Sequence, residues 1–282
     1  MLHPYLADSS RPRILAHRGL TTPAMHAAGI VENSRAAIEA AIDAGSDIVE
    51  TDCHLTLDGE VVLFHDADLA RVTGDPRKIA DVTLAELAAI MAEQGGVITL
   101  GAALAAYPTT RFNVDVKAGA AAEQIGQLVA PHAHRVLLTS FADAFRTRAL
   151  AAAAAAEATG AAAGAAPAAS IAEPADPQPA IRRAPAASPG QRGVIRILLA
   201  VLTGIGVARA LRGFDALQIP ERQGPLRVLT PRLLRAAHRH GVEVHVWTVN
   251  DPDQMRALID LGVDGIVTDR ADVAIEVLRP QK

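Results

Sequence analysis

The residues best able to do chemistry in this sequence lie close together in Val49–Asp66, which reads VETDCHLTLDGEVVLFHD. Side chains alternate faces along a strand, so Glu50, Asp52 and His54 are predicted to share one side of it. Two carboxylates this close repel each other unless a proton or a cation intervenes. A hard divalent cation bound by oxygen ligands is the simplest arrangement that satisfies both.

A third acidic side chain is predicted to join this pair from another strand. Asp115 lies in FNVDVK, where Asn113 and Lys117 share its face. Glu50, Asp52 and Asp115 are therefore the candidate ligands of a magnesium or calcium ion (Mg²⁺ or Ca²⁺). Salt-bridged surface groups are the alternative, which would account for one acid but less well for three at the ends of two strands.

Two histidines complete the candidate site. His17 lies in the triplet His17-Arg18-Gly19, and His65 follows the predicted hairpin. Histidine titrates near neutral pH, so the pair suits an in-line displacement at phosphorus, with one base and one acid. Arg18 and Lys117 add fixed positive charge, which favours a phosphate over a carbonyl group or a sugar. Gly19 is predicted to let its loop pass close to the ligand.

Strand-like and helical segments alternate from residue 13 to residue 269, which predicts a parallel sheet with right-handed crossovers. The α/β pattern contains eight strand-like segments, the number of a TIM (β/α)8 barrel. A doubly wound sheet is the alternative, but the glycine-rich phosphate loop of that fold is missing from the sequence. Asp58-Gly59 predicts a small hairpin insertion after the second strand. The eight segments are ILAHRG, DIVETD, FNVDVK, VLLTSF, RAPAAS, DALQIP, VHVWTV and DGIVTD.

One domain is expected over residues 1–282, with a flexible Ala/Pro-rich insertion at residues 151–192. Closure of the barrel requires a short strand within Ile181–Gly190. The apolar segment Gly193–Leu211 contains about a dozen apolar residues between arginines, against the ~20 that a membrane span needs. It is predicted to be a helix with a buried face, and binding at a membrane interface is the alternative.

Composition excludes several classes of protein. The 282 residues carry a net charge of −4 and only 3% aromatic residues, so no nucleic-acid partner is expected. The single cysteine, Cys53, excludes an intramolecular disulfide. The N-terminus lacks the apolar region of a secretory signal, so we expect a cytoplasmic protein without stable membrane insertion. The oligomeric state stays open.

Taken together, these pieces resemble the glycerophosphodiester phosphodiesterase family. The resemblance covers most of the chain outside the Ala/Pro-rich segment, and the order and spacing of the pieces are more specific than any one of them. The matching pieces are HRG at 17–19, EN at 32–33, ETD at 50–52, TLDGEVVLFHD at 56–66, RVTG at 71–74 and VHVWTVND with GVDGIVTDR near the end.

The resemblance implies a TIM barrel that hydrolyses glycerophosphodiesters to an alcohol and glycerol 3-phosphate with the help of a divalent metal ion. It implies roles for ten residues: acid–base catalysis for His17 and His65, metal binding for Glu50, Asp52 and Asp115, phosphate binding for Arg18 and Lys117, and the substrate pocket for Trp247, Glu32 and Asn33. His54 is expected to lie behind the ligands, and Asp269 to fix the last strand or the pocket floor.

The third acid departs from the family pattern, which commonly has Glu two residues before the Lys. Asp115 is one methylene shorter and resembles the related sphingomyelinase D and phospholipase D-like branch. A lysophospholipase D-like enzyme acting on acylated lipids is therefore one alternative. A non-catalytic phosphate-binding barrel is another, although the complete set of His, acid and Lys residues argues against it.

Overall fold

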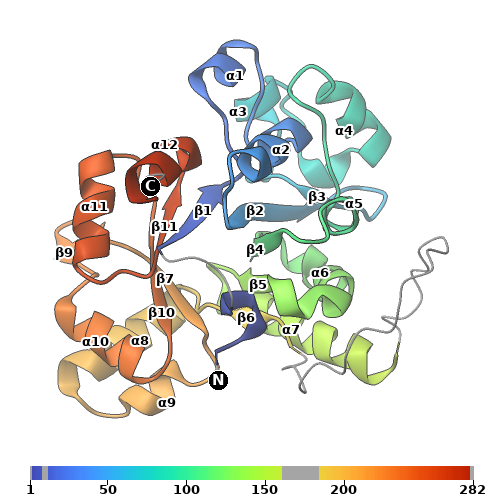
Figure 1. The fold of residues 1–282 in the computed structure, drawn as a ribbon. Coiled ribbons are helices and arrows are strands. Elements are labelled where there is room, and N and C mark those ends of the chain that lie inside the picture. The colour runs from blue at the N-terminus through green and yellow to red at the C-terminus, as the bar shows by residue number, and fades with distance from the viewer. Residues whose placement is uncertain (1, 8–11, 161–183, 280–282) are drawn as a thin grey trace, which may run out of the picture.

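The chain folds into a nearly closed barrel of eight parallel strands, which confirms the predicted TIM-barrel fold (Figure 1). This computed structural model describes residues 2–7, 12–160 and 184–279. The strands follow one another in the order β6-β5-β4-β2-β1-β11-β10-β7. Their bounds are β1 Arg13–His17, β2 Ile48–Leu55, β4 Arg111–Val116, β5 Val136–Thr139, β6 Ala186–Ala187, β7 Ala216–Pro220, β10 Glu243–Trp247 and β11 Gly265–Thr268.

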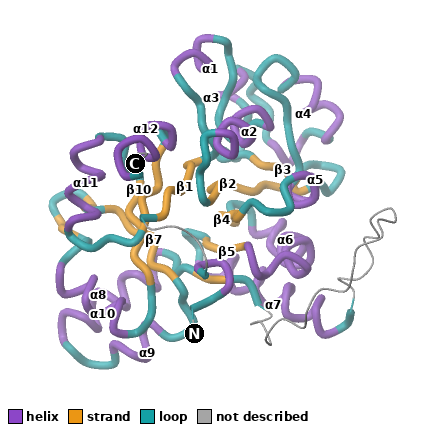
Figure 2. Tube along the Cα trace, viewed as in Figure 1, coloured by secondary structure: helices purple, strands orange, loops and turns teal. Residues whose placement is uncertain are grey.

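Helices surround the strands, as Figure 2 shows. Side-chain caps begin several of them: Ser34 accepts from Ala37 N, and Thr83 and Glu86 form a capping box. The bounds are α1 Pro23–Ala27, α2 Arg35–Asp43, α3 Ala70–Thr73, α4 Leu84–Ile90, α5 Leu100–Ala106, α6 Ala122–Val129, α7 Asp143–Ala158, α8 Gln191–Thr203, α9 Val207–Leu211, α10 Pro231–Arg239, α11 Pro252–Asp260 and α12 Ala271–Leu278, with short 3-10 turns at Pro4–Leu6, Ile79–Asp81, Gly119–Ala121 and Ala130–Arg135.

The predicted hairpin after the second strand is present. Strand β3 (Val61–Leu63) pairs antiparallel with β2, and Gly59 provides the left-handed turn with a φ of 83°. A second hairpin, β8 (Arg222–Gln223) with β9 (Leu226–Arg227), was not expected from the sequence. It follows β7 directly, so it lies at the end of the barrel where the parallel strands finish.

The barrel closes between β6 and β7 through individual hydrogen bonds. Strand β6 lies in the predicted segment and is only two residues long, which leaves little room for a ladder. The carbonyl of Ala187 accepts from Asp215 N at 2.9 Å, and Asp215 Oδ2 accepts from Ala187 N at 3.0 Å. Beside them, Gln218 N donates to Ser188 Oγ. We call this junction the seam.

Both ends of the expected insertion, residues 151–192, contain regular secondary structure, and the helix expected after it is divided in two. Residues 151–158 belong to α7, and residues 184–192 contain β6 and the start of α8, whereas residues 161–183 lie outside the described part. The single helix predicted at Gly193–Leu211 is in fact two, because Gly204 ends α8 with a φ of 78°. The outer face of α8 is also apolar, since Leu199 is 57% exposed and Leu202 is 70% exposed. None of the helices in the described ranges is long and apolar enough to cross a membrane.

A buried ion pair lies inside the barrel, on two strands that are far apart in the sequence. Arg13 of β1 donates to both carboxylate oxygens of Glu243 of β10, at 2.5 and 2.7 Å. His245 Nε2 donates to the same carboxylate at 3.1 Å, and all three side chains are at most 3% exposed. His245 is therefore a core residue.

Candidate active site

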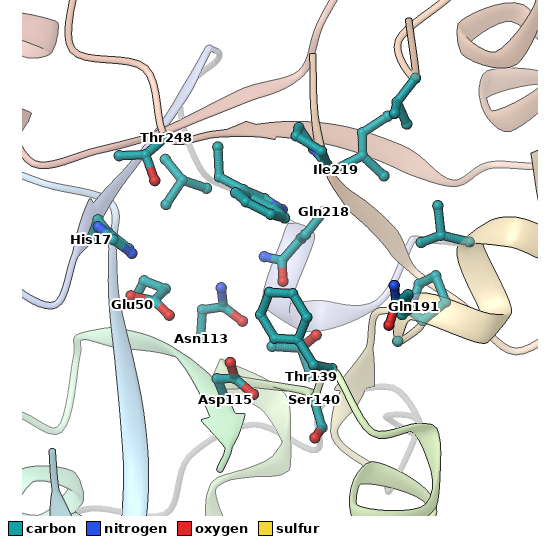
Figure 3. A pocket seen from close by; sticks show the side chains of 18 of the residues that line it. His17, Glu50, Asn113, Asp115, Thr139, Ser140, Gln191, Gln218, Ile219 and Thr248 are labelled. Carbon is teal, nitrogen blue, oxygen red and sulfur yellow. The ribbon is translucent and has the colours of Figure 1, made fainter. Parts of the chain in front are cut away.

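A cavity of about 480 Å³ opens where the parallel strands end. All the catalytic, phosphate-binding and metal-ligand candidates from the sequence line it, together with Trp247. Figure 3 shows its polar side around His17, Glu50 and Asp115, and its other side around Ile219 and Gln191. The apolar side is formed by Phe141, Val194, Ile195, Leu198, Ile219, Leu226, Val228 and Trp247.

The three acids come together because β2 and β4 are neighbours in parallel register. Glu50 pairs with Asn113, and Asp52 with Asp115, so the acids lie on adjacent strands at nearly the same level. All three acids are buried, with exposed fractions between 1% and 7%. The sequence prediction that Asp115 joins the first two acids is consistent with this register.

Lys117 and Arg18 supply the nearest positive charges. Lys117 Nζ lies 3.0 Å from Asp52 Oδ1 and 2.8 Å from Asp115 Oδ2. Arg18 Nε lies 3.3 Å from Asp52 Oδ2, and the backbone N–H of Arg18 donates to Glu50. Both side chains line the cavity as predicted, but each is also tied to the acids.

Two cations do not neutralise three buried carboxylates. Burial, followed by the charge of Asp52, raises the pKa of Glu50 to about 8. Burial also raises the pKa of Asp115, although Lys117 acts in the opposite direction. Glu50 is therefore mostly protonated at neutral pH, and a further positive charge beside it would favour its ionised form.

The donor set fits a hard divalent cation in its chemistry. Asp115 Oδ1 and Asn113 Oδ1 are buried and have no hydrogen-bond partner among the described residues, so two oxygen acceptors are unused. Lys117, however, bridges Asp52 and Asp115. Within the described ranges, no three His, Cys, Asp or Glu side chains are placed to hold a metal together. In the structure, the Lys117 ammonium thus lies between two of the three acids, Asp52 and Asp115.

Each predicted catalytic histidine is oriented by a carboxylate at 2.6 Å from its Nδ1. His17 pairs with Asp269, and His65 pairs with Asp66. Because a carboxylate accepts, Nδ1 donates in both pairs, which leaves Nε2 of each ring for other contacts. Asn250 Nδ2 in turn donates to the second oxygen of Asp269.

The charge of His17 depends on these neighbours. Burial disfavours the imidazolium, but the hydrogen bond to Asp269 and the charge of Glu50 outweigh it and raise the pKa of His17. Asp269, which the sequence assigned only to the last strand or the pocket floor, is therefore part of the site. The signal that could have found it is barrel closure, because β11 pairs with β1.

His54 lies behind the cavity rather than on its wall. Its Nε2 donates to the backbone carbonyl of His65 at 3.0 Å. Burial lowers the pKa of His54, so the neutral ring is favoured. His54 thus fixes the segment that carries His65, which agrees with the predicted position behind the ligands.

Glu32 and Asn33 are placed next to other site residues and are not part of the cavity wall. Glu32 accepts from Arg18 at 2.7 Å and from Arg71 at 2.6 Å. Asn33, in the left-handed conformation with a φ of 56°, donates to Asp52 Oδ2 at 3.0 Å. Both residues therefore position residues of the polar side.

Gly19 is required by its contact with a neighbouring helix. It has a φ of 85°, and a Cβ there would lie 2.7 Å from the backbone of Ala37 in α2. The close approach that the structure shows is therefore to a helix. This contact lets α2 pack against the turn that carries Arg18.

Trp247 contributes an aromatic wall to the cavity. Its ring meets Phe141 edge to face, with centroids 5.9 Å apart and planes at 68°. Phe141 also lies 5.3 Å from Lys117 Nζ, so the aromatic pair separates the charged side of the cavity from the aliphatic side.

Comparison with known proteins identifies the family. Residues 17–273 match the Glycerophosphoryl diester phosphodiesterase family. A Mycobacterium tuberculosis protein named "Probable glycerophosphodiester phosphodiesterase 2" is 35% identical over 94% of this chain and 89% of its own length. A lysophospholipase D of Rattus norvegicus is 23% identical over 95% of this chain and 87% of its own length.

Solved structures agree on the fold. A glycerophosphodiester phosphodiesterase from Thermotoga maritima superposes with a TM-score of 0.67 at 23% identity, covering 96% of this chain and all of that one. A phosphodiesterase from Oleispira antarctica, solved with the product sn-glycerol-3-phosphate, gives 0.64 at 20% identity, covering 95% and 97%. With the sequence match over residues 17–273, the chain belongs to the glycerophosphoryl diester phosphodiesterase family.

Proposed function

We propose that this enzyme cleaves glycerophosphodiesters to an alcohol and glycerol 3-phosphate with His17 and His65 as its acid–base pair. The observation that supports this most is that both histidines line one cavity while a carboxylate holds Nδ1 of each ring. One histidine deprotonates the nucleophile, which is water, or the substrate's own glycerol hydroxyl in a two-step route whose cyclic phosphate is then opened by water to glycerol 3-phosphate. The other protonates the leaving alkoxide.

Arg18 and Lys117 are proposed to bind the phosphate. Both already form ion pairs with buried carboxylates, so an incoming phosphate diester competes with Asp52 for their positive charge. Their charge favours the anionic substrate and the added charge of the transition state. Trp247 is proposed to contact the organic part of the substrate on the far side of Phe141, while Glu32 and Asn33 hold the polar side in place.

Glu50, Asp52 and Asp115 are proposed to hold a divalent metal ion, magnesium or calcium. Enzymes of this family generally depend on such an ion. The unused oxygens of Asp115 and Asn113 and the raised pKa of Glu50 support a cation at this place. A bound divalent ion supplies Lewis-acid stabilisation of phosphate charge. Because Lys117 now bridges two of the acids, its ammonium is the group that must exchange partners when the cation binds.

The assignment of the histidines is tested with glycerophosphocholine as substrate. His17→Ala and His65→Ala should each lower kcat by ~100-fold or more, since general acid–base catalysis typically contributes 10²–10⁴. His238→Ala is the matched control, because His238 also pairs with a carboxylate, Asp264, but lies outside the cavity. Circular dichroism checks folding. A His17→Ala variant that keeps the full rate would refute the assignment.

Hydrolysis of lysophospholipids is the second candidate function. The apolar side of the cavity, with Val194, Ile195 and Leu198 on α8, offers a surface that a water-soluble diester does not need. A relative of similar length is named a lysophospholipase D. The two functions are separated by kcat/KM on lysophosphatidylcholine and glycerophosphocholine, and a higher value on the lysolipid would favour the second.

A further inference from the structure

The outer face of α8 presents large apolar side chains to solvent beside the mouth of the cavity. Ile195, Leu199 and Leu202 are 50%, 57% and 70% exposed. They are spaced by four and three residues, so they form one row along the helix, which we call the α8 stripe. Ile205, just beyond the helix, is 78% exposed. A soluble surface seldom clusters side chains of this kind without a use for them.

The α8 stripe is continuous with the catalytic cavity. Ile195 belongs to the stripe and also lines the cavity, together with Val194 and Leu198 of the same helix. Phe141 and Leu226 line the same cavity and are 61% and 60% exposed. An apolar path therefore leads from the solvent face of α8 to the site of chemistry.

The segment that carries this surface is rich in arginine. Residues 191–240 contain nine arginines and only two acids, Asp215 and Glu221, although the whole chain has a net charge of −4. Arg192 and Arg196 precede Ile195 and Leu199 by three residues, so each lies beside the stripe. Both side chains are exposed. Among the described residues, neither arginine has a recorded ion pair.

We propose that the α8 stripe and its arginines bind the enzyme to the surface of an anionic lipid bilayer. Aliphatic side chains enter the boundary between headgroups and acyl chains, while arginines pair with lipid phosphates. A second copy of the chain is a poorer occupant, because a symmetric dimer through this face would bring two arginine-rich surfaces together. Docking in this way places the cavity mouth at the bilayer.

The test is flotation of the full-length protein with vesicles of phosphatidylcholine alone and of equal parts phosphatidylcholine and phosphatidylglycerol. Binding is expected on the anionic vesicles and should weaken with salt. Leu199→Gln/Leu202→Gln should weaken it at least ~10-fold through lost apolar burial. Arg192→Gln/Arg196→Gln should weaken it by about 10-fold or more through lost attraction to anionic lipid.

Two matched controls carry the same substitutions elsewhere. Leu57→Gln changes a leucine that is 63% exposed at the β2–β3 turn, and Arg148→Gln changes an exposed arginine of α7. Both should bind vesicles as the unchanged protein does. All four variants should hydrolyse soluble glycerophosphocholine normally, since none of these residues lines the cavity.

Three results would overturn the proposal. The first is no binding of the unchanged protein to anionic vesicles at low salt, and the second is an equal loss of binding in the controls. The third is a dimer in light scattering that Leu199→Gln/Leu202→Gln dissociates. Vesicle binding needs no turnover, so inactivity on every diester would refute the proposed function and leave this proposal standing.

Discussion

Replacing Asp269 with Asn tests whether its carboxylate sets the state of His17. The substitution keeps the size of the side chain and the possibility of a hydrogen bond, but it removes the negative charge that lies 2.6 Å from His17 Nδ1. Burial lowers the pKa of His17 and is the largest influence on it, and without the Asp269 charge fewer contacts would oppose it. The pKa of His17 should therefore fall.

The size of the effect follows from the environment of the pair. A hydrogen bond to a charged group contributes about 1.5–3 kcal/mol. The Asp269 side chain is 49% exposed, so solvent screens it and the lower end applies. A loss of about 1.5 kcal/mol corresponds to roughly a tenfold decrease in kcat/KM. Asp269 is a positioning residue, so this decrease should be smaller than that of His17→Ala.

The assay is the pH profile of kcat/KM on glycerophosphocholine. Because Asp269 raises the pKa of His17, Asp269→Asn should move the limb that reports His17 toward lower pH. Asp264→Asn is the control, since it removes the carboxylate of the His238 pair, 2.7 Å from that ring, and should leave the profile in place. An Asp269→Asn enzyme with an unchanged rate and unchanged profile would refute the reasoning.

Four other predictions concern the metal, the segment behind the cavity and, in two cases, the core. Treatment with a chelator should abolish diester hydrolysis and lower Tm, and magnesium or calcium should restore both; activity that persists in the chelator would contradict the metal site. His54→Ala should lower kcat by about fivefold, because one hydrogen bond of about 1 kcal/mol to the His65 carbonyl is lost; steady-state kinetics measure this, and a rate equal to that of His65→Ala would make His54 catalytic. Arg13→Met should lower the free energy of unfolding, measured with urea, by about 3–5 kcal/mol, since Glu243 is left charged and buried. Hydrogen bonds from Arg13 and His245 outweigh burial and lower the pKa of Glu243 from 4.5 to about 2. The stabilisation from ionised Glu243 is therefore present above pH 4.5 and is lost as the pH falls toward 2. A free energy of unfolding that stays constant over this range would exclude the ion pair as a source of stability.

The polar side of the site could be predicted because strand geometry alone places it. Alternation puts Glu50 and Asp52 on one face of β2, and the parallel register of β4 brings Asp115 beside them. The hairpin that returns the chain to His65 was readable from Asp58-Gly59. These relations are local, or they follow from neighbouring strands of a known fold.

The residues that sequence reasoning missed depend on contacts between distant parts of the chain. Asp269 meets His17 only because β11 pairs with β1, 252 positions away in the sequence. The sequence assigns Lys117 a positive charge but not a partner, because its long side chain can reach either of two acids, Asp52 and Asp115. The helix at Gly193–Leu211 was predicted from apolar content, which does not reveal which side of a helix the barrel covers, so the apolar outer face of α8 was missed.

The seam between β6 and β7 divides the enzyme into two halves with different freedom to change. It lies on the opposite side of the strand order from β1 and β2, whose complete ladders carry His17, Glu50 and Asp52. The apolar wall on α8 follows the seam directly. Substitutions or small shifts along residues 184–230 can therefore reshape the pocket for a new alcohol group while the reacting groups keep their spacing. In this barrel, the range of substrates can diverge independently of the chemistry.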